Sequence, residues 1–294
     1  MIYIVPESGL GNRFRAIDSA LQLAIYRKTK LKIFWKVNPD VGAGFFDLFE
    51  PIRTIIGAVE VKDYPGYGYY DKPYDVYFTG LKKLFRPPVI DIPDWDALEI
   101  AEQYPDLFSK LSPEDNLYDE RFEKHLKDIW DKKWPGRNLY IRTYSRFFGN
   151  PVSKYDYFKP KKEIVMKAEK IIDRYGDHIT GVHIRRVDNT ESIETSTTEK
   201  FISAMEAELN NNPAMKFFLA TDSNEDRILM ESHFKNKIIF HPSVLERGSA
   251  AGMKDALVEL YCLSRTKKII GSYYSSFTDV AVYYNGLKEY KIIT

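Results

Sequence analysis

The segment 179–188 reads ITGVHIRRVD, a short apolar run that ends in two adjacent arginines. Residues 179–184 have the length and composition of a buried β-strand, and Arg185 and Arg186 follow it directly. In parallel α/β sheets, ligands bind at the carboxyl ends of the strands. Two guanidinium groups there predict an anion site, because guanidinium stays charged and matches phosphate oxygens in pairs. A surface ion pair with Asp188 is the alternative.

Short apolar strands alternate with helical patterns on both sides of this segment. Strands are predicted at 179–184, 216–220, 237–240 and 267–271, and helices at 161–175, 196–209, 224–234, 253–264 and 276–285. The pattern Ser196-x-x-Glu199 is a capping box that opens the second of these helices. This alternation is typical of a parallel sheet with helices on both faces.

The N-terminal residues show the opening of a second Rossmann-like unit. A strand at 2–5, a loop with Gly9, Gly11 and Asn12, a helix from Arg13 and a strand at 31–35 are predicted. The loop allows close backbone approach to a ligand. As a dinucleotide fingerprint it is defective, because Phe14 occupies the third glycine position. An NAD(P) dehydrogenase is therefore an alternative that rests on the Rossmann pattern alone.

Two domains follow from these patterns, with boundaries at 1–155 and 156–294. Residues 62–137 are rich in proline, and we interpret them as an irregular, aromatic-rich insertion with short helices near 95–103 and 120–134. A further strand is predicted at 138–143. The many tyrosines and phenylalanines suit sugar contacts, but core packing is the favoured interpretation.

Polar residues follow other predicted strands of the second half. Asp222 can hold a ribose, a base edge or a metal, or it can cap the next helix. Ser275 and Ser276 stand where a helix N-terminus would suit a phosphate, with a plain serine cap as the competing interpretation. His183 shares a face with Arg185 in an extended chain, and it is either a ligand contact or a core histidine.

Composition excludes several classes of protein. Lysine plus arginine number 43 and aspartate plus glutamate 42, a net charge of +1 that argues against nucleic-acid binding over a broad surface. The one cysteine, Cys262, excludes an internal disulfide and a cysteine-rich zinc site, and we expect it to be buried packing. Without a signal-peptide pattern or a run of about 18 apolar residues, we expect a cytoplasmic protein without a transmembrane segment. Peripheral membrane contact and the oligomeric state stay open.

No metal or cofactor is expected. Asp94-Trp95-Asp96 matches the D-x-D pattern by which many sugar-nucleotide enzymes hold a divalent ion. The helix predicted directly after Pro93 favours Asp94 as its N-cap instead. The five histidines are scattered along the chain, without metal-ligand spacing.

Three segments together resemble a known family. Residues 182–188, 218–223 and 255–281 resemble, in order and spacing, the motifs of the α-1,6-fucosyltransferases, the rhizobial nodulation enzyme among them. Residues 9–13 resemble the N-terminal glycine loop of the wider fucosyltransferase superfamily. The resemblance implies an α/β, GT-B-like enzyme of two Rossmann-like domains whose parallel sheets face a cleft. It also implies metal-independent transfer with inversion from a GDP-sugar donor, GDP-fucose, in glycan biosynthesis.

The resemblance also implies roles for individual residues. Arg185 and Arg186 neutralise the donor diphosphate, which Ser276 also touches, either alone or together with Ser275. Asp222 and the backbone near His183 hold the guanine. The glycine loop with Gly9, Gly11 and Asn12 adds donor contacts, and the first domain faces the acceptor.

The catalytic base departs from the family pattern. Relatives place a carboxylate shortly after the arginine pair, where this chain has Ile193 flanked by Glu191 and Glu194. One of these glutamates is the predicted base, and a solvated loop charge is the alternative. The acceptor is a glycan or a lipid-linked sugar. A non-catalytic protein that binds a GDP-sugar or a glycan is the rival function.

Overall fold

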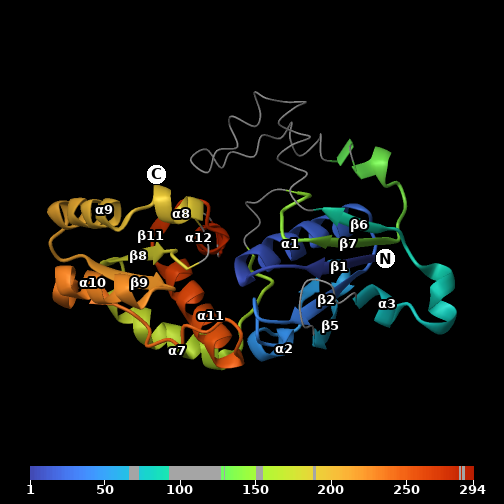
Figure 1. Ribbon diagram of the computed structural model, residues 1–294, viewed down its shortest axis with the longest axis horizontal. Coiled ribbons are helices and arrows are strands. Elements are labelled where there is room, and N and C mark those ends of the chain that lie inside the picture. Colours follow the sequence, from blue (N-terminus) through green and yellow to red (C-terminus); the bar gives the residue numbers. More distant parts are fainter. Residues whose placement is uncertain are drawn as a thin grey trace. The chain divides into compact units, whose positions relative to one another are not determined.

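A computed structural model describes residues 1–65, 73–92, 127–128, 130–149, 155–187, 190–284, 286 and 289–294. The chain divides into two compact units. Unit 1 comprises Met1–Ser153, Tyr157–Lys159 and Arg247–Ala250, and unit 2 comprises Lys154–Asp156, Pro160–Glu246 and Ala251–Thr294. Each unit contains a parallel sheet with helices packed against it (Figure 1).

The sheet of unit 1 has five parallel strands in the order β5-β2-β1-β7-β6. They are β1 (Ile2–Pro6), β2 (Leu31–Val37), β5 (Glu60–Pro65), β6 (Val89–Ile92) and β7 (Leu139–Thr143). Because all run parallel, their carboxyl ends share one edge and their amino ends the other. The interpretation of 62–137 as an irregular insertion with short helices missed two strands, since β5 ends within this range and β6 lies inside it. Both are outer strands, where charge and proline are tolerated and no continuous apolar run is required.

Aromatic side chains hold α3 (Pro73–Tyr77) against this sheet. The ring centroids of Tyr3 and Phe78 lie 5.1 Å apart, and those of Tyr74 and Tyr140 4.7 Å apart. Phe34 stacks on Tyr3 at 5.8 Å. The aromatics described in this part of the chain therefore serve packing, as the sequence favoured.

The other elements of unit 1 are short, except for the long helix that follows the glycine loop. They are α1 (Leu10–Tyr26), α2 (Phe45–Leu48), β3 (Arg53–Thr54), β4 (Gly57–Ala58) and the 3-10 helix η1 (Gly80–Phe85). Residues 127–128 and 130–133 are also helical, whereas the helix expected near 95–103 lies outside the described residues. None of the described helices combines the length and apolar character needed to cross a bilayer.

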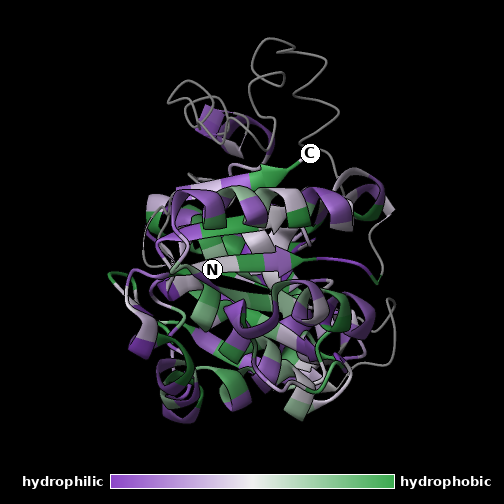
Figure 2. Ribbon diagram, turned by 90° about the vertical axis from the view of Figure 1, so that its left-hand side faces the viewer, coloured by the Kyte–Doolittle hydropathy of each residue, from purple (hydrophilic) through white to green (hydrophobic). Residues whose placement is uncertain are grey.

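Unit 2 has a second five-stranded parallel sheet in the order β10-β9-β8-β11-β12. Its strands are β8 (Ile179–Ile184), β9 (Lys216–Thr221), β10 (Ile238–Ile239), β11 (Lys268–Ser272) and β12 (Glu289–Ile293). Its helices are α7 (Lys162–Ile172), η2 (Asp173–Tyr175), α8 (Thr190–Thr195), α9 (Thr198–Asn211), α10 (Asn224–Phe234), η3 (Lys235–Lys237), α11 (Ala250–Arg265) and α12 (Ser276–Tyr283). Figure 2 shows hydrophobic residues concentrated in the strands, as expected for sheets covered by helices.

The predictions for unit 2 missed the helix α8 and the edge strand β12, and the predicted capping box was wrong. The edge strand β12 was not predicted, because EYKII alternates weakly and its outer side needs no apolar face. The capping box at Ser196 does not form: its hydroxyl donates to the Ile293 carbonyl (2.6 Å) and accepts from the Tyr273 amide (2.8 Å). Thr197 is the N-cap of α9 instead. Cys262 is fully buried, as predicted.

Candidate functional site

The residues that follow β8, β9 and β11 meet at the carboxyl edge of the unit 2 sheet. The Arg185 amide donates to Ser272 Oγ (2.9 Å) at the end of β11. Asp222, just after β9, accepts from Arg185 Nη1 (2.7 Å) and from the Arg186 amide (2.8 Å). We call Arg185 and Arg186, where the chain turns after β8, the arginine turn. The Asp222 carboxylate thus binds both the main chain and one guanidinium of this turn.

The two arginines have different partners. The Arg185 side chain is 20% exposed and forms its ion pair with Asp222. The Arg186 side chain is 13% exposed and turns to Asp226 (3.3 Å between Nε and Oδ2) and to Thr198 Oγ1 (3.0 Å). Thr198 in turn donates to Asp226 (2.8 Å). Arg186 therefore ties the start of α9 to α10, whereas Arg185 is the more accessible cation at the strand end.

Asp222 does not cap the helix that follows it. The N-cap of α10 is Ser223, whose hydroxyl accepts from the Asp226 amide (3.1 Å). The interpretation of Asp222 as a cap was wrong because serine, one residue later, supplies the acceptor that the helix needs. The carboxylate is left to bind the arginine turn.

His183 is a core histidine in this structure. Its Nδ1 lies 2.7 Å from Thr278 Oγ1, and its ring packs against Phe277 with centroids 4.9 Å apart. Burial, with a smaller contribution from Arg185 and Arg186, lowers the pKa of His183 to about 3. The imidazole is neutral at physiological pH, so it does not serve as a proton donor there.

Ser275 and Ser276 occupy different positions at the start of α12. Ser275 is the N-cap, and its buried hydroxyl accepts from the Thr278 amide (3.5 Å). Ser276 is the first helical residue and is partly exposed. The cap interpretation applies to Ser275, and Ser276 is the better placed of the two for a ligand.

The two candidate bases lie on α8. Glu191 and Glu194 are both exposed, and their spacing of three residues places them on one side of the helix. Asp188 lies outside the described residues, so the alternative of a surface ion pair with it stays a prediction. The same holds for Asp94 and Asp96; among described side chains, no cluster suited to a metal ion occurs.

The glycine loop lies in unit 1, at the carboxyl end of β1. The helix α1 begins at Leu10, three residues earlier than predicted, with Gly9 as its extended N-cap. Gly11 and Asn12 therefore stand in its first turn, where Asn12 Nδ2 donates to Ser8 Oγ (3.0 Å). A methyl group added at Gly9 would meet nothing within 4 Å, so the space above this cap is open.

Sequence reasoning missed Arg13, which the structure buries behind this loop. Its guanidinium donates to the Ser8 carbonyl (2.9 Å) and Asn38 Oδ1 (2.8 Å), and it lies 4.7 Å from the Trp35 ring centroid. Burial lowers its pKa to about 10, so it remains charged. Its hydrogen bonds determine the shape of the loop, and its place on a largely apolar helix face was the signal available in the sequence.

A second missed group is Glu259, on the buried side of α11. Ser243 Oγ donates to it (2.7 Å), and Arg227 Nη2 lies 3.8 Å away. Burial raises the pKa of Glu259 to about 8, and the nearby carboxylates of Asp255 and Asp222 add to this effect. The helical pattern of the sequence gave no sign of it, because a lone glutamate on an amphipathic helix is usually exposed.

We expect Glu259→Gln to stabilise the protein at alkaline pH. Because its folded pKa exceeds the unfolded one, the contribution of Glu259 to stability is fully present below about pH 4.5 and is lost as the pH rises through about 8. The expected slope is on the order of 1 kcal/mol per pH unit in that window. Urea unfolding at several pH values checks this, since glutamine removes the titration but keeps the acceptor for Ser243. If the free energy of unfolding depends on pH in the same way in the wild type and in Glu259→Gln, the prediction is contradicted.

Comparison with known proteins gives matches in structure only. No protein-family model and no curated protein sequence matches the chain. The fucosyltransferase NodZ from Bradyrhizobium aligns with 95% of this chain and 91% of its own, at 20% identity and a TM-score of 0.60. POFUT1 in complex with GDP-fucose aligns with 99% and 97%, at 12% identity and a TM-score of 0.53. The chain therefore has the two-domain, Rossmann-like GT-B fold of these enzymes.

Proposed function

We propose that the protein is a fucosyltransferase that moves fucose from GDP-fucose to a glycan or lipid-linked acceptor with inversion. The observation that carries the proposal is Arg185, held by Asp222 and Ser272 at the carboxyl edge of the unit 2 sheet. The chain that carries this arginine has the fold of solved fucosyltransferases, and one of those enzymes was co-crystallised with GDP. Unit 2 is the donor side in this proposal, and unit 1 is the acceptor side. Gly9, Gly11 and Asn12 of the glycine loop add contacts to the donor.

The chemistry requires stabilisation of a departing diphosphate. The bond from the sugar C1 to the phosphate oxygen breaks, the acceptor oxygen forms the new bond to C1, and GDP leaves with the added negative charge. Arg185 and the amide end of α12 at Ser276 supply positive charge at the place where that charge develops, so no metal is needed. The acceptor proton passes to Glu191 or Glu194.

A non-catalytic binder of GDP-sugars is the second candidate. Ile193 occupies the position where the fucosyltransferase pattern expects the base, and both neighbouring glutamates are exposed on α8. Such a protein would use the same arginine turn to bind the diphosphate without transferring the sugar.

A nucleotide screen followed by a hydrolysis assay tests the proposal. Ligands that bind only the folded state stabilise it by about 2.7 kcal/mol at a hundredfold excess over Kd. This stabilisation raises the melting temperature. We expect GDP and GDP-fucose to stabilise the protein more than ADP, UDP or NAD, and GDP-fucose to be hydrolysed slowly in excess EDTA. Stabilisation by GDP-fucose without hydrolysis would favour the non-catalytic binding protein. Stabilisation by NAD alone would favour the NAD(P) dehydrogenase alternative. Stabilisation by none of these ligands would overturn the proposal.

A further inference from the structure

Unit 1 presents an exposed apolar segment that its own packing does not explain. In η1, Leu81, Leu84 and Phe85 are 82%, 78% and 73% exposed. The segment is anchored, because Phe78 just before it is buried and Arg86 just after it donates to the Phe78 carbonyl (3.1 Å). Large apolar side chains exposed together in this way mark interaction sites in soluble proteins.

Basic residues are interleaved with these apolar ones. Lys82, Lys83 and Arg86 are exposed within the same turn and its continuation. Lys82 lies over the Tyr77 ring, 4.2 Å from its centroid, and Arg86 reaches Asp75 (3.3 Å). The segment therefore combines an apolar tip with a net positive flank.

The segment lies on the amino edge of the unit 1 sheet, because η1 leads directly into β6. The residues that precede the other strands share that edge: Met1 before β1, Lys28 and Lys30 before β2, and Arg137 before β7. Figure 1 shows the N-terminus, α3 and the helical residues near 130 on this same side of the sheet. The glycine loop stands at the opposite, carboxyl edge.

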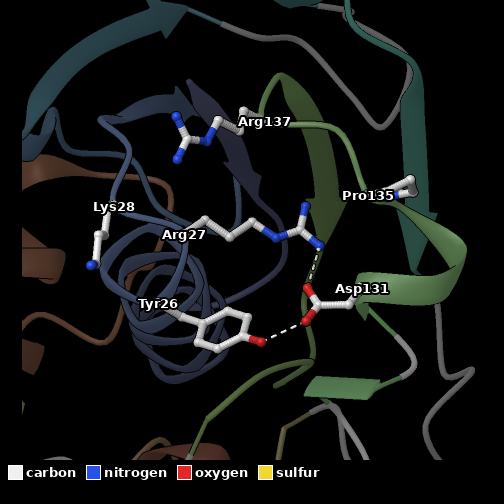
Figure 3. Close-up of a pocket in the computed structure, with 6 residues that line it drawn as sticks. All are labelled: Tyr26, Arg27, Lys28, Asp131, Pro135 and Arg137. Carbon is white, nitrogen blue, oxygen red and sulfur yellow. Dashed lines mark hydrogen bonds and ion pairs between the residues drawn. The ribbon is translucent and has the colours of Figure 1, made fainter.

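A shallow basic cavity of about 340 Å³ adds to this edge (Figure 3). Arg27 is held in its wall by the Trp130 carbonyl (2.8 Å) and by Asp131 (3.4 Å). Lys28 and Arg137 line the cavity with exposed side chains. The nearby helical residues add the exposed Lys132 and Lys133, and the exposed Asp128 offsets one of these charges. In a chain of net charge +1, this concentration of cations is local.

We propose that the amino edge of the unit 1 sheet binds the surface of an anionic lipid bilayer. Leu81, Leu84 and Phe85 would enter the interfacial region, while the surrounding lysines and arginines contact anionic headgroups. Lysine is depleted in protein interfaces, which disfavours a protein partner. A second copy of the same face would bring like charges together, which disfavours self-association. The proposal does not depend on the sugar-transfer activity.

Vesicle co-sedimentation of the full chain without nucleotide tests this. We expect binding to mixed phosphatidylcholine–phosphatidylglycerol vesicles, little binding to phosphatidylcholine alone, and weaker binding at high salt. Replacing Leu81, Leu84 and Phe85 together with alanine, or Lys82→Glu with Lys83→Glu, should each lower the bound fraction at least tenfold. All these side chains are exposed, so folding and GDP binding should be unchanged.

The matched control is Met166→Ala with Lys170→Glu on α7 of unit 2, which are exposed residues of the same kinds. This control should bind vesicles as the wild type does. Equal binding by the wild type and both patch variants would overturn the proposal, as would a wild type that ignores anionic vesicles. A wild-type dimer that the triple alanine variant converts to monomer, without vesicle binding, would assign the face to self-association and also overturn it.

Discussion

Replacing Arg185 by alanine is expected to lower the rate of fucose transfer from GDP-fucose by about 100-fold or more. Arg185 stands at the carboxyl end of β8, where its Nη1 donates to Asp222 and its main-chain amide donates to Ser272 Oγ. A cation positioned before the reaction stabilises the leaving diphosphate without reorganisation, and its loss is felt mainly in the transition state. The measurement is kcat with saturating GDP-fucose, alongside the free energy of unfolding.

Arg186→Ala tests the neighbouring arginine, for which the resemblance implies a diphosphate role and the structure shows contacts between α9 and α10. The Arg186 guanidinium bonds Asp226 and Thr198, so its removal leaves a largely buried carboxylate without its charged partner. We expect unfolding to become easier by on the order of 2 kcal/mol. Arg185→Ala should cost less stability, because Asp222 keeps the Arg186 amide as a donor and is more exposed than Asp226. If Arg185→Ala lowers kcat by no more than a few-fold, the proposed role is contradicted.

The central strands of both units were predictable from the sequence because they are buried on both faces. Ile179–Ile184 and Lys216–Thr221 are short, buried and largely apolar runs, so their length and composition indicated strands. Chain order then placed Arg185 and Asp222 at one edge. The outer strands β5, β6 and β12 were missed because one side of each needs no neighbour and the local pattern carries charge and proline.

The contacts within the candidate site could not be predicted in the same way. Nothing in the order His183-Ile184-Arg185-Arg186 says which guanidinium turns to Asp222 and which to Asp226, because that depends on how the chain turns after β8. Glu259 was missed for a related reason. Its burial is decided by Ser243 and Arg227, which other segments of the chain bring to it.

The role of Asp222 now has two competing accounts. The family resemblance assigns it to guanine, whose N1–H and N2 amino donors one carboxylate can accept together. The structure engages both of its oxygens, Oδ2 with Arg185 Nη1 and Oδ1 with the Arg186 amide. A carboxylate keeps further lone pairs, so both roles are compatible with these hydrogen bonds.

A double-mutant cycle separates these accounts. We propose that Asp222 acts by positioning Arg185, so Asp222→Asn should weaken GDP binding about tenfold in the wild type and hardly at all in Arg185→Ala. The coupling energy would then be of the order of 1 kcal/mol, within the range found for residues in contact. Titration calorimetry with GDP and UDP on the wild type, the two single variants and the double variant measures this coupling energy.

The preference for GDP over UDP gives the second readout. If Asp222 acts through Arg185, Asp222→Asn weakens both nucleotides by a similar factor, since the arginine contacts the diphosphate that they share. If Asp222 reads guanine, the variant loses affinity for GDP while UDP binding hardly changes, and the loss persists without Arg185. A base contact left with a neutral amide forfeits a charge-assisted hydrogen bond of roughly 1.5–3 kcal/mol, which calorimetry resolves. A selective loss of that size would return Asp222 to the base-reading role implied by the family resemblance.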